Sequence, residues 1–285
     1  MAQKHAYLIM AHGEFALLRG LVRALDDPRN DLFIHIDAKV PELPDVQTEK
    51  AGLFMLKTRI DVRWGDVSQI ETELLLFKAA ATKGPYAYYH LLSGVDLPLK
   101  NQDYIHHFFE LHAGKEFIGF AETALTPEII RKVQRWHLFP RHFRDGDLIT
   151  RLLRSIFLRI QELAGIRRNR DIAFCKGANW VSVTDAFVQY FLSNEEWVRK
   201  VFSHTFCADE MVLQTLCWNS PFRQKLYDIN NEWRGNLRLI GWKDGRLQDW
   251  QATDYDLLTT SDALFARKFN TSDMRFIERV LSLSQ

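Results

Sequence analysis

Cysteine is scarce in this chain of 285 residues, which holds only Cys175, Cys207 and Cys217. A disulfide-stabilised scaffold of this length would need more cysteines, so the small, odd number favours a reducing compartment. The spacing of the three cysteines matches no zinc-binding pattern, which removes the commonest small metal motif from consideration.

Long apolar runs are also missing. The N-terminal stretch 6–11 is apolar, but His12, Gly13 and Glu14 interrupt it, so it is too short for a membrane span or for the core of a signal peptide. We interpret it as a first strand and expect a cytoplasmic protein without a transmembrane segment. The sequence contains no internal repeat and no low-complexity segment.

An excess of one charge sign is absent as well. The 37 basic and 36 acidic residues leave a net charge of +1, which argues against a broad nucleic-acid-binding surface and leaves room only for a local basic groove. Aromatic residues, in contrast, make up 13% of the chain. Tryptophan and tyrosine often line sugar or nucleoside sites, although most aromatic side chains pack in the core.

The first forty residues predict an α/β fold. Strand-like residues 5–11 precede a helical apolar period over 15–25, and a second strand is expected over 32–36. This β-α-β order predicts a parallel sheet whose ligands sit at the carboxyl ends of the strands, where His12 and Asp37 lie. No G-x-G-x-x-G motif accompanies them. Asp37 could contact a ribose or base, or could cap a turn, and the sequence favours neither.

A buried strand over 86–92 is followed by Ser93-Gly94-Val95-Asp96, after an amphipathic helix over 68–81. Many nucleotide-sugar transferases carry an Asp-x-Asp metal ligand pair after such a strand. Here the corresponding residues are Gly94-Val95-Asp96, so glycine replaces the first aspartate and only Asp96 carries a carboxylate. A single carboxylate is a poor site for magnesium or manganese. We therefore predict that no metal is bound.

The middle of the chain is basic. A helix over 101–111 and a strand over 117–120 are expected before a basic, aromatic segment that extends over about 128–170. Apolar residues at helical spacing over 152–160 predict a helix within it. The segment could be a solvated helical insertion or a mobile wall on the acceptor side of an active site.

The most chemically informative stretch is 174–216. It contains the loop Lys176-Gly177-Ala178-Asn179-Trp180, a strand over 181–183 and a helix capped by Thr184 and Asp185. Asp209 and Glu210 then precede an apolar helix, where adjacent carboxylates could simply cap the helix or could do acid–base chemistry. Downstream, Arg267 and Lys268 lie between two phenylalanines, and such a positioned cation can stabilise a diphosphate leaving group without a metal.

Seven strings occur in an order that resembles one family. They are HAYLIMAH, FIHIDAK, YHLLSGVDLPLK, KGANW with its helix, ADE before an apolar helix, LRLIGW and LFARKF. Each is weak alone. Together, from residue 5 to residue 269, they resemble the Core-2/I-branching β-1,6-N-acetylglucosaminyltransferases and the related peptide O-xylosyltransferases.

The resemblance implies a GT-A-like α/β fold in a single domain, 1–285. A Rossmann-like mixed sheet would be flanked by helices, with a nucleotide-binding half, 1–112, and an acceptor-binding and catalytic half, 113–285. It implies inverting transfer from a UDP-sugar without a metal or other cofactor. The family pattern places the catalytic base on Glu210, and places donor contacts on residues Asp37, Arg238 and Lys268. We add His12 and Asp96, which end strands, to the donor side.

On the acceptor side, the branching enzymes use a lysine and an arginine three residues apart, the arginine preceding a tryptophan. Lys132, Arg135 and Trp136 match this spacing, and Glu122 matches more loosely an upstream acceptor-binding glutamate. We add Trp180 of the KGANW loop. The expected substrates are a UDP-sugar, with N-acetylglucosamine or xylose transferred, and a glycan hydroxyl.

The chain departs from eukaryotic members, which carry a Golgi membrane anchor and several disulfides. We therefore expect a bacterial, cytoplasmic relative that modifies a surface glycan or reaches a lipid-linked precursor from the membrane periphery. Two other functions stay open. A catalytically inactive nucleotide- or carbohydrate-binding protein would retain the fold. A glycosidase using Asp209 and Glu210 is less favoured, because neighbouring side chains usually diverge whereas a glycosidase needs facing carboxyls.

Overall fold

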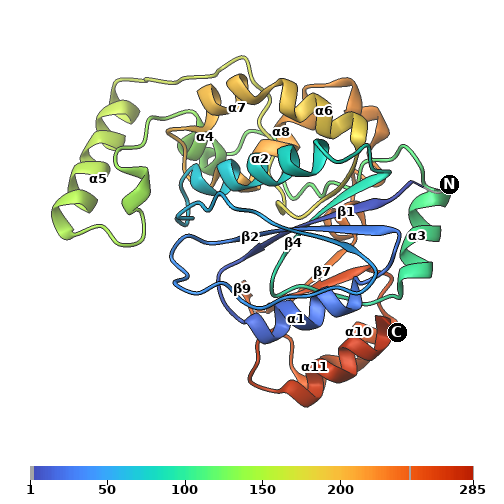
Figure 1. The fold of residues 1–285 in the computed structure, drawn as a ribbon. Coiled ribbons are helices and arrows are strands. Elements are labelled where there is room, and N and C mark those ends of the chain that lie inside the picture. Colours follow the sequence, from blue (N-terminus) through green and yellow to red (C-terminus); the bar gives the residue numbers. More distant parts are fainter. Residues whose placement is uncertain (1–2, 244, 285) are drawn as a thin grey trace.

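A five-stranded sheet with strand order β3-β2-β1-β4-β6 forms the centre of the molecule (Figure 1). The computed structural model describes residues 3–243 and 245–284. Strands β1 to β4 run parallel, and β6 pairs antiparallel with β4. The sheet is therefore mixed, as the family resemblance implies. The strands are β1 (His5–Ala11), β2 (Asn30–Ile36), β3 (Gly52–Met55), β4 (Tyr88–Ser93) and β6 (Ser182–Thr184).

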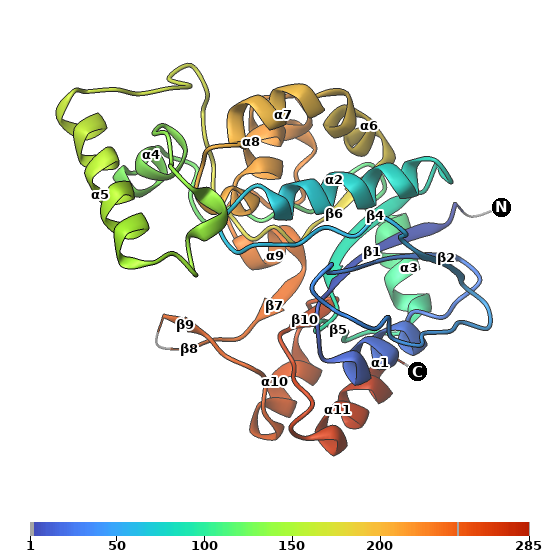
Figure 2. The ribbon, with the colours of Figure 1, turned by 60° about the vertical axis from the view of Figure 1, so that its left-hand side comes forward.

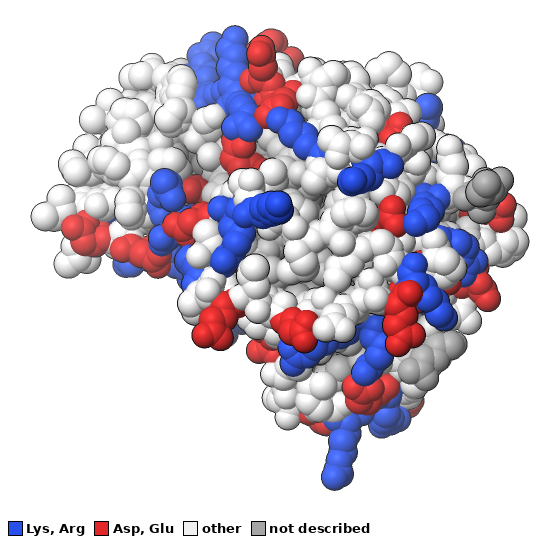
Figure 3. Space-filling model, viewed as in Figure 1, with Lys and Arg blue, Asp and Glu red and all other residues white. Residues whose placement is uncertain are grey.

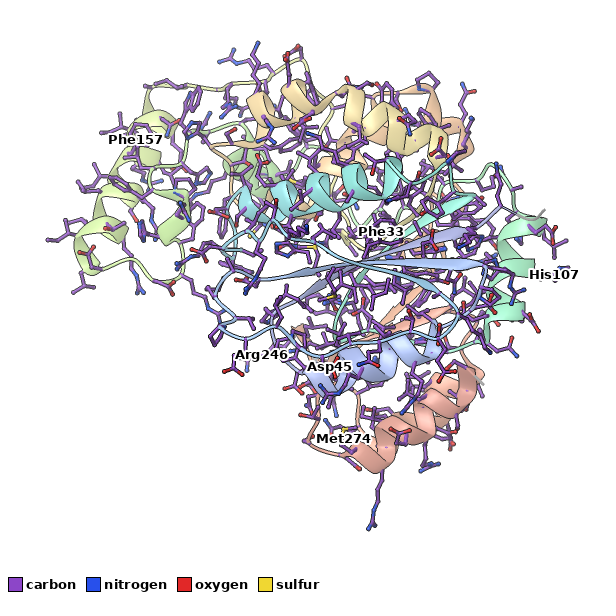
Figure 4. The ribbon with its side chains drawn as sticks, viewed as in Figure 1. Phe33, Asp45, His107, Phe157, Arg246 and Met274 are labelled. Carbon is purple, nitrogen blue, oxygen red and sulfur yellow. The ribbon has the colours of Figure 1, made fainter. Side chains whose placement is uncertain are left out.

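Both faces of this sheet are covered by helices, which explains why its strands are apolar on both sides. Along β1, Ala6 and Leu8 join one core, whereas Tyr7 and Ile9 join the other, because successive side chains point to opposite faces. In Figure 4, Phe33 of β2 marks the core on the α2 side. Helices on that side are α2 (Ser68–Ala81), α6 (Asp185–Ser193), α7 (Glu195–Phe202) and α8 (Val212–Trp218); the other core is covered by α1 (Phe15–Ala24), α3 (Gln102–Leu111) and α11 (Met274–Leu281).

A second, three-stranded sheet joins the C-terminal third of the chain to the segment after β4 (Figure 2). Its central strand pairs antiparallel with one neighbour and parallel with the other. The pairing sets Phe265 opposite Arg238 and Arg267 opposite Ile240, so two sequence-distant basic segments lie side by side. The strands are β5 (Leu97–Pro98), β10 (Phe265–Arg267) and β7 (Arg238–Ile240).

The carboxyl ends of β1, β2 and β4 meet at one edge of the main sheet, as the β-α-β pattern predicts. The backbone N–H of Asp37 donates to the carbonyl of Ala11 at 2.9 Å, and the N–H of Gly94 donates to the carbonyl of Met10 at 2.9 Å. A Cβ at Gly94 would lie 2.7 Å from the Cβ of Ala11, so this close approach requires glycine. His12, Asp37 and Asp96 are thereby gathered at the same edge.

Helix α5 (Leu148–Leu163) of the basic segment projects from the body, whereas α4 (Pro127–Val133) packs Ile129 and Val133 into the core on the α2 side. A short 3₁₀ turn at Pro140–His142 lies between the two helices. Figures 1 and 2 both show α5 well away from the central sheet. Its N-terminus is capped by Asp147, whose carboxylate accepts from the N–H of Thr150 at 2.7 Å. The helix expected over 152–160 is thus longer at both ends.

The expected strand over 117–120 was wrong. This segment makes only isolated bridges, Glu116 with Leu226 and Phe117 with Ser182. Gly119 packs against the carbonyl of Glu232, so the chain is held by close contact there instead of by a ladder. The remaining elements are α9 (Glu232–Asn236), β8 (Trp242–Lys243), β9 (Arg246–Leu247) and α10 (Tyr255–Thr260), with 3₁₀ turns at Ala208–Glu210, Pro221–Lys225, Ala252–Asp254 and Ser282–Ser284.

Candidate functional site

The loop Lys176–Trp180, which we call the KGANW loop, is anchored at nearly every residue. The N–H of Gly177 donates to the carbonyl of Glu210 at 2.9 Å, and the N–H of Ala178 donates to the Glu232 carboxylate at 2.9 Å. The carbonyl of Ala178 accepts from the Gln214 side chain at 2.7 Å. Because separate elements hold it, the loop can fix the side chains that it presents.

Glycine is required at position 177 by packing. A Cβ there would clash with the carbonyl oxygen of Gly119, because it would lie closer than van der Waals contact allows. The oxygen is a backbone atom and cannot rotate away. This contact and the hydrogen bond to Glu210 place the KGANW loop between the chain at 119 and the turn at 208–210.

Glu210 lies in the 3₁₀ turn Ala208–Glu210. Its side chain is 41% exposed, so its carboxylate is accessible to a ligand. Lys176 Nζ of the KGANW loop is 3.6 Å from Glu210 Oε2 and 3.1 Å from Glu128 Oε1. Although partial burial opposes it, the charges of Glu210 and Glu128 raise the pKa of Lys176. Lys176 thus lies between the carboxylates of Glu210 and Glu128.

Glu128 extends this arrangement to the helix α4, because Lys132 Nζ lies 2.7 Å from the same Oε1 atom. Hydrogen bonds from Lys132 and Lys176 lower the pKa of Glu128 to about 2. Glu210, Lys176, Glu128 and Lys132 therefore form one alternating network of charges, which we call the carboxylate–lysine network.

Of the two roles considered for Asp209 and Glu210, capping of the following helix does not occur. Helix α8 begins at Val212, its cap residue is Met211, and no side chain accepts a hydrogen bond from its first turn. The two acids occupy the preceding 3₁₀ turn instead. Their surroundings also differ: the charge of Asp209 interacts with buried Glu73, whereas Glu210 pairs with Lys176.

Asp209 and Glu73 form an acidic pair beneath the site. Glu73 of α2 is fully buried, accepts one hydrogen bond of 3.3 Å from Asn179 Nδ2, and leaves Oε2 without a partner. Burial and the charge of Asp209 raise the pKa of Glu73 well above its usual range. Burial, followed by the charge of Glu210, raises the pKa of Asp209 to about 7. A protonated pair here would limit the negative charge next to Glu210.

We expect this raised pKa to make stability fall as pH rises from about 4 to about 8. Folded Asp209 holds its proton up to pH 7, whereas the unfolded chain releases it near pH 4, so folding is disfavoured above that pH by up to about 1.4 kcal/mol per pH unit in this window. The Asp209→Asn variant should therefore gain melting temperature relative to wild type as pH rises. Thermal unfolding at several pH values measures this.

The control for that experiment is Asp262→Asn, which changes an exposed carboxyl outside any helix. Its melting temperature should follow the wild-type curve at every pH. A constant offset between Asp209→Asn and wild type across pH 4–8 would contradict the raised pKa of Asp209.

Among the predicted donor residues, Asp96 is completely buried, and both of its carboxylate oxygens accept hydrogen bonds. Its carboxylate accepts from the N–H of Ser93 at 2.9 Å, from the Ser93 hydroxyl, and from Arg267 Nε at 3.1 Å. The Arg267 guanidinium also stacks 4.2 Å from the ring centre of Trp180, the last residue of the KGANW loop. Asp96 thus orients Arg267, and the KGANW loop reaches the cationic segment as well as Glu210.

The two other predicted donor cations lie in different surroundings. Arg238 is 1% exposed and donates to the carbonyls of Asn236 at 2.7 Å and Val181 at 2.9 Å. Burial lowers its pKa to about 10, which leaves it charged at neutral pH. Lys268 is 38% exposed on its side chain and lies 3.3 Å from Asp249. In this structure Lys268 is the more accessible cation, and Arg238 supports the chain around β6.

Asp37 makes the turn that was one of its two expected roles. One carboxylate oxygen accepts from the N–H of Lys39 at 2.8 Å and the other pairs with Lys39 Nζ at 2.7 Å. His12 is exposed at the same sheet edge. A contact of Asp37 or His12 with a nucleotide stays a prediction.

The predicted acceptor residues divide into two groups. Lys132 belongs to the carboxylate–lysine network, and Glu122 bridges backbone to backbone with Lys176, its N–H donating at 3.0 Å. Arg135 is buried and donates to the carbonyl of Ile166, inside the insertion, and Trp136 stacks against His204 and the guanidinium of Arg168. Trp180 is 6% exposed beneath Arg267. The structure brings Glu122 and Lys132 toward Glu210; Arg135 and Trp136 hold the insertion.

Sequence reasoning missed Lys176 and Glu128 as members of the site, and it did not foresee that Arg267 pairs with Asp96. Lys176 lies in the KGANW loop and Arg267 lies next to Lys268. Their position beside predicted site residues was the local signal that could have pointed to them. Their partners lie 34 and 171 residues away in sequence, which no local pattern reveals.

A partly exposed carboxylate at Glu210 and oriented cations at Arg267 and Lys268 stand beside a mixed α/β sheet, and this arrangement agrees with the family comparison. The family described as Core-2/I-Branching enzyme matches residues 5–265. The chain belongs to the Core-2/I-branching enzyme family. Its fold is consistent with the GT-A-like architecture of glycosyltransferases, and the family's enzymes transfer sugars, so the chain is assigned to the glycosyltransferases.

Two relatives extend over almost the whole of this family member. The N-acetyllactosaminide beta-1,6-N-acetylglucosaminyl-transferase of Mus musculus is 24% identical, with 98% of this chain and 74% of the relative covered. The human protein of the same name is 22% identical, again with 98% and 74% covered.

Three further observations concern metal ligands, membrane-spanning helices and cysteines. Across residues 3–243 and 245–284, no three histidine, cysteine or acidic side chains gather closely enough to hold a metal ion. In the same part of the chain, every helix is too short or too polar to span a bilayer. All three cysteines are buried free thiols.

Proposed function

We propose that this Core-2/I-branching family member is an inverting, metal-independent glycosyltransferase. It would move a sugar, N-acetylglucosamine or xylose, from a UDP-sugar to a hydroxyl of a glycan acceptor. N-acetylglucosamine comes first because both relatives are named for its transfer. The observation that carries the proposal is the KGANW loop, which contacts Glu210 through Gly177 and Lys176 at one end and Arg267 through Trp180 at the other.

Glu210 would act as the base. The acceptor hydroxyl gives its proton to the Glu210 carboxylate while its oxygen attacks the anomeric carbon from the face opposite the diphosphate. The bond from that carbon to the diphosphate breaks, UDP leaves with the electron pair, and the configuration inverts. Lys176 would hold the Glu210 carboxylate in place, and Lys132 and Glu122, which contact Glu128 and Lys176, would face the acceptor.

Fixed cations would take the place of a metal at the leaving group. Lys268 and Arg267 are adjacent, and Arg267 is oriented by Asp96 and Trp180. Preorganised cations stabilise developing phosphate charge without reorganising during the reaction. Asp96 stands where other nucleotide-sugar transferases carry metal ligands, but its carboxylate is already bound by Ser93 and Arg267. This donor set supports a metal-free reaction.

We expect UDP to bind wild type equally with and without EDTA, and to bind the Lys268→Ala variant at least about tenfold more weakly, because a charge-assisted contact to phosphate contributes about 1.5–3 kcal/mol. Isothermal titration calorimetry measures both. The Lys115→Ala control removes an exposed lysine on the turn after α3 and should bind UDP as wild type does. Absence of UDP binding in every condition would overturn the donor site.

Turnover separates the proposal from an inactive binding protein. Wild type incubated with UDP-N-acetylglucosamine, UDP-xylose and a panel of glycans should release UDP and form a glycosidic product of inverted configuration. UDP binding without transfer to any acceptor or water would favour the inactive protein.

A further inference from the structure

The outward face of α5 is apolar. Seven of its leucines and isoleucines are 46–84% exposed: Leu148, Ile149, Leu152, Leu153, Ile156, Ile160 and Leu163. With 3.6 residues per turn these side chains fall within one arc of about 140° around the helix. Figure 3 shows the corresponding broad white surface on the projecting lobe, with charged side chains at its margins. Contiguous exposed apolar surface of this kind marks an interaction site.

Two polar side chains of α5, Gln161 and Arg154, contact the protein, whereas Arg151, Ser155 and Arg159 are exposed, Arg159 among the apolar side chains. Gln161 is buried, and its amide exchanges two hydrogen bonds with the backbone of Trp136, at 2.8 and 2.9 Å. Arg154 donates to the carbonyl of His142 at 3.1 Å and lies over the ring of Phe143. Surface helices normally turn the apolar stripe to the core, so this orientation is reversed. Polar contacts hold the helix, and the apolar stripe is left for a partner.

The flanking segment is strongly basic. Residues 141–170 hold eight arginines and three acids, a net charge of +5 in a chain whose total is +1. Arg144, Arg151, Arg167 and Arg170 are exposed and make no ion pair within the described part of the chain. An apolar stripe with uncompensated arginines beside it complements a surface that offers hydrocarbon below a layer of negative charge.

We propose that α5 and its flanking arginines dock on an anionic lipid bilayer surface. The leucines and isoleucines would enter the boundary between headgroups and acyl chains, and the arginines would contact lipid phosphates, as amphipathic interfacial helices do. A second copy of this chain fits less well, because pairing two α5 faces would bring two segments of charge +5 together. The inference concerns binding alone and does not depend on the enzymatic reaction.

The test is sedimentation with phosphatidylcholine vesicles and with vesicles that also contain phosphatidylglycerol. We expect wild type to sediment with the anionic vesicles and to be released as salt rises, since screening weakens the arginine contacts. The Leu152→Glu/Ile156→Glu variant should lose vesicle binding by at least about tenfold, because it removes two apolar side chains from the bilayer and adds two charges that the anionic headgroups repel. Both positions are exposed, so folding should be unaffected.

The control is Leu111→Glu/Leu257→Glu, which changes two comparably exposed leucines on α3 and α10 and should bind the vesicles as wild type does. UDP calorimetry on all three proteins separates this inference from the proposed function. Wild type that fails to sediment with anionic vesicles would overturn the proposal. So would light scattering that shows a dimer which Leu152→Glu/Ile156→Glu converts to a monomer, with no vesicle binding.

Discussion

Replacing Glu210 by glutamine should lower kcat by roughly 10²–10⁴ while UDP still binds with near wild-type affinity. Glutamine preserves the shape of the side chain but cannot accept the acceptor's proton. Glu210 lies on the Lys176 end of the KGANW loop, whereas the proposed diphosphate cations lie on the Trp180 end, so donor binding should survive. Transfer kinetics, once a donor and acceptor are known, and UDP calorimetry on the same preparation measure the two effects.

The matched control for this substitution is Glu110→Gln, an exposed glutamate near the end of α3, which should retain wild-type kcat. A Glu210→Gln enzyme within a few-fold of wild-type kcat would show that another group takes the proton. Loss of UDP binding in Glu210→Gln would instead place the residue on the donor side.

Replacing Gly177 by alanine should reduce stability by about 3 kcal/mol or more and should also reduce transfer by about 10²-fold. The new methyl group would meet the backbone carbonyl of Gly119, so the KGANW loop must shift. That shift would move Lys176 away from Glu210 and disturb Trp180 beneath Arg267. Urea unfolding and transfer assays on soluble variant protein measure both effects.

Gly20→Ala provides the comparison. Its new Cβ would lie 2.8 Å from Leu281 Cδ1, the end of a flexible side chain that can move aside, and alanine favours helix at this position in α1. We expect its stability to change little. Equal effects of the two substitutions would show that Gly177 has no special packing role, and a stable but inactive Gly177→Ala would separate loop position from folding.

The sequence pattern predicted correctly those elements that depend on residues close together in the chain. The helix over 68–81 agrees with α2 residue for residue, because its apolar period depends on near neighbours. The strands β1 and β2 and the cap at Thr184 were likewise predicted, the last because its hydroxyl accepts from the N–H of Phe187, three residues on. The strand over 117–120 failed because its apolar residues are buried by Gly119 packing and isolated bridges, which period alone cannot distinguish from a ladder.

The candidate site divides along the same line. The proposed base Glu210 and the pair Arg267-Lys268 could be named from strings in the sequence, and the family itself followed from seven strings in order. Arg238 and Asp96 show the opposite case: residue type favours a ligand contact for both, yet the structure buries Arg238 on the carbonyl of Val181 and Asp96 on Arg267.

By itself, the sequence determined the β-α-β start of the fold, the helix α2, the family and a short set of chemically capable residues. The tertiary structure alone decided that Lys176 pairs with Glu210 and Asp96 with Arg267, and that the charge of Asp209 acts on buried Glu73. It also decided that the apolar face of α5 points outward. The physical reason is that periodicity records burial along one element, whereas ion pairs, buried charges and exposed faces depend on residues that chain folding brings together from far apart.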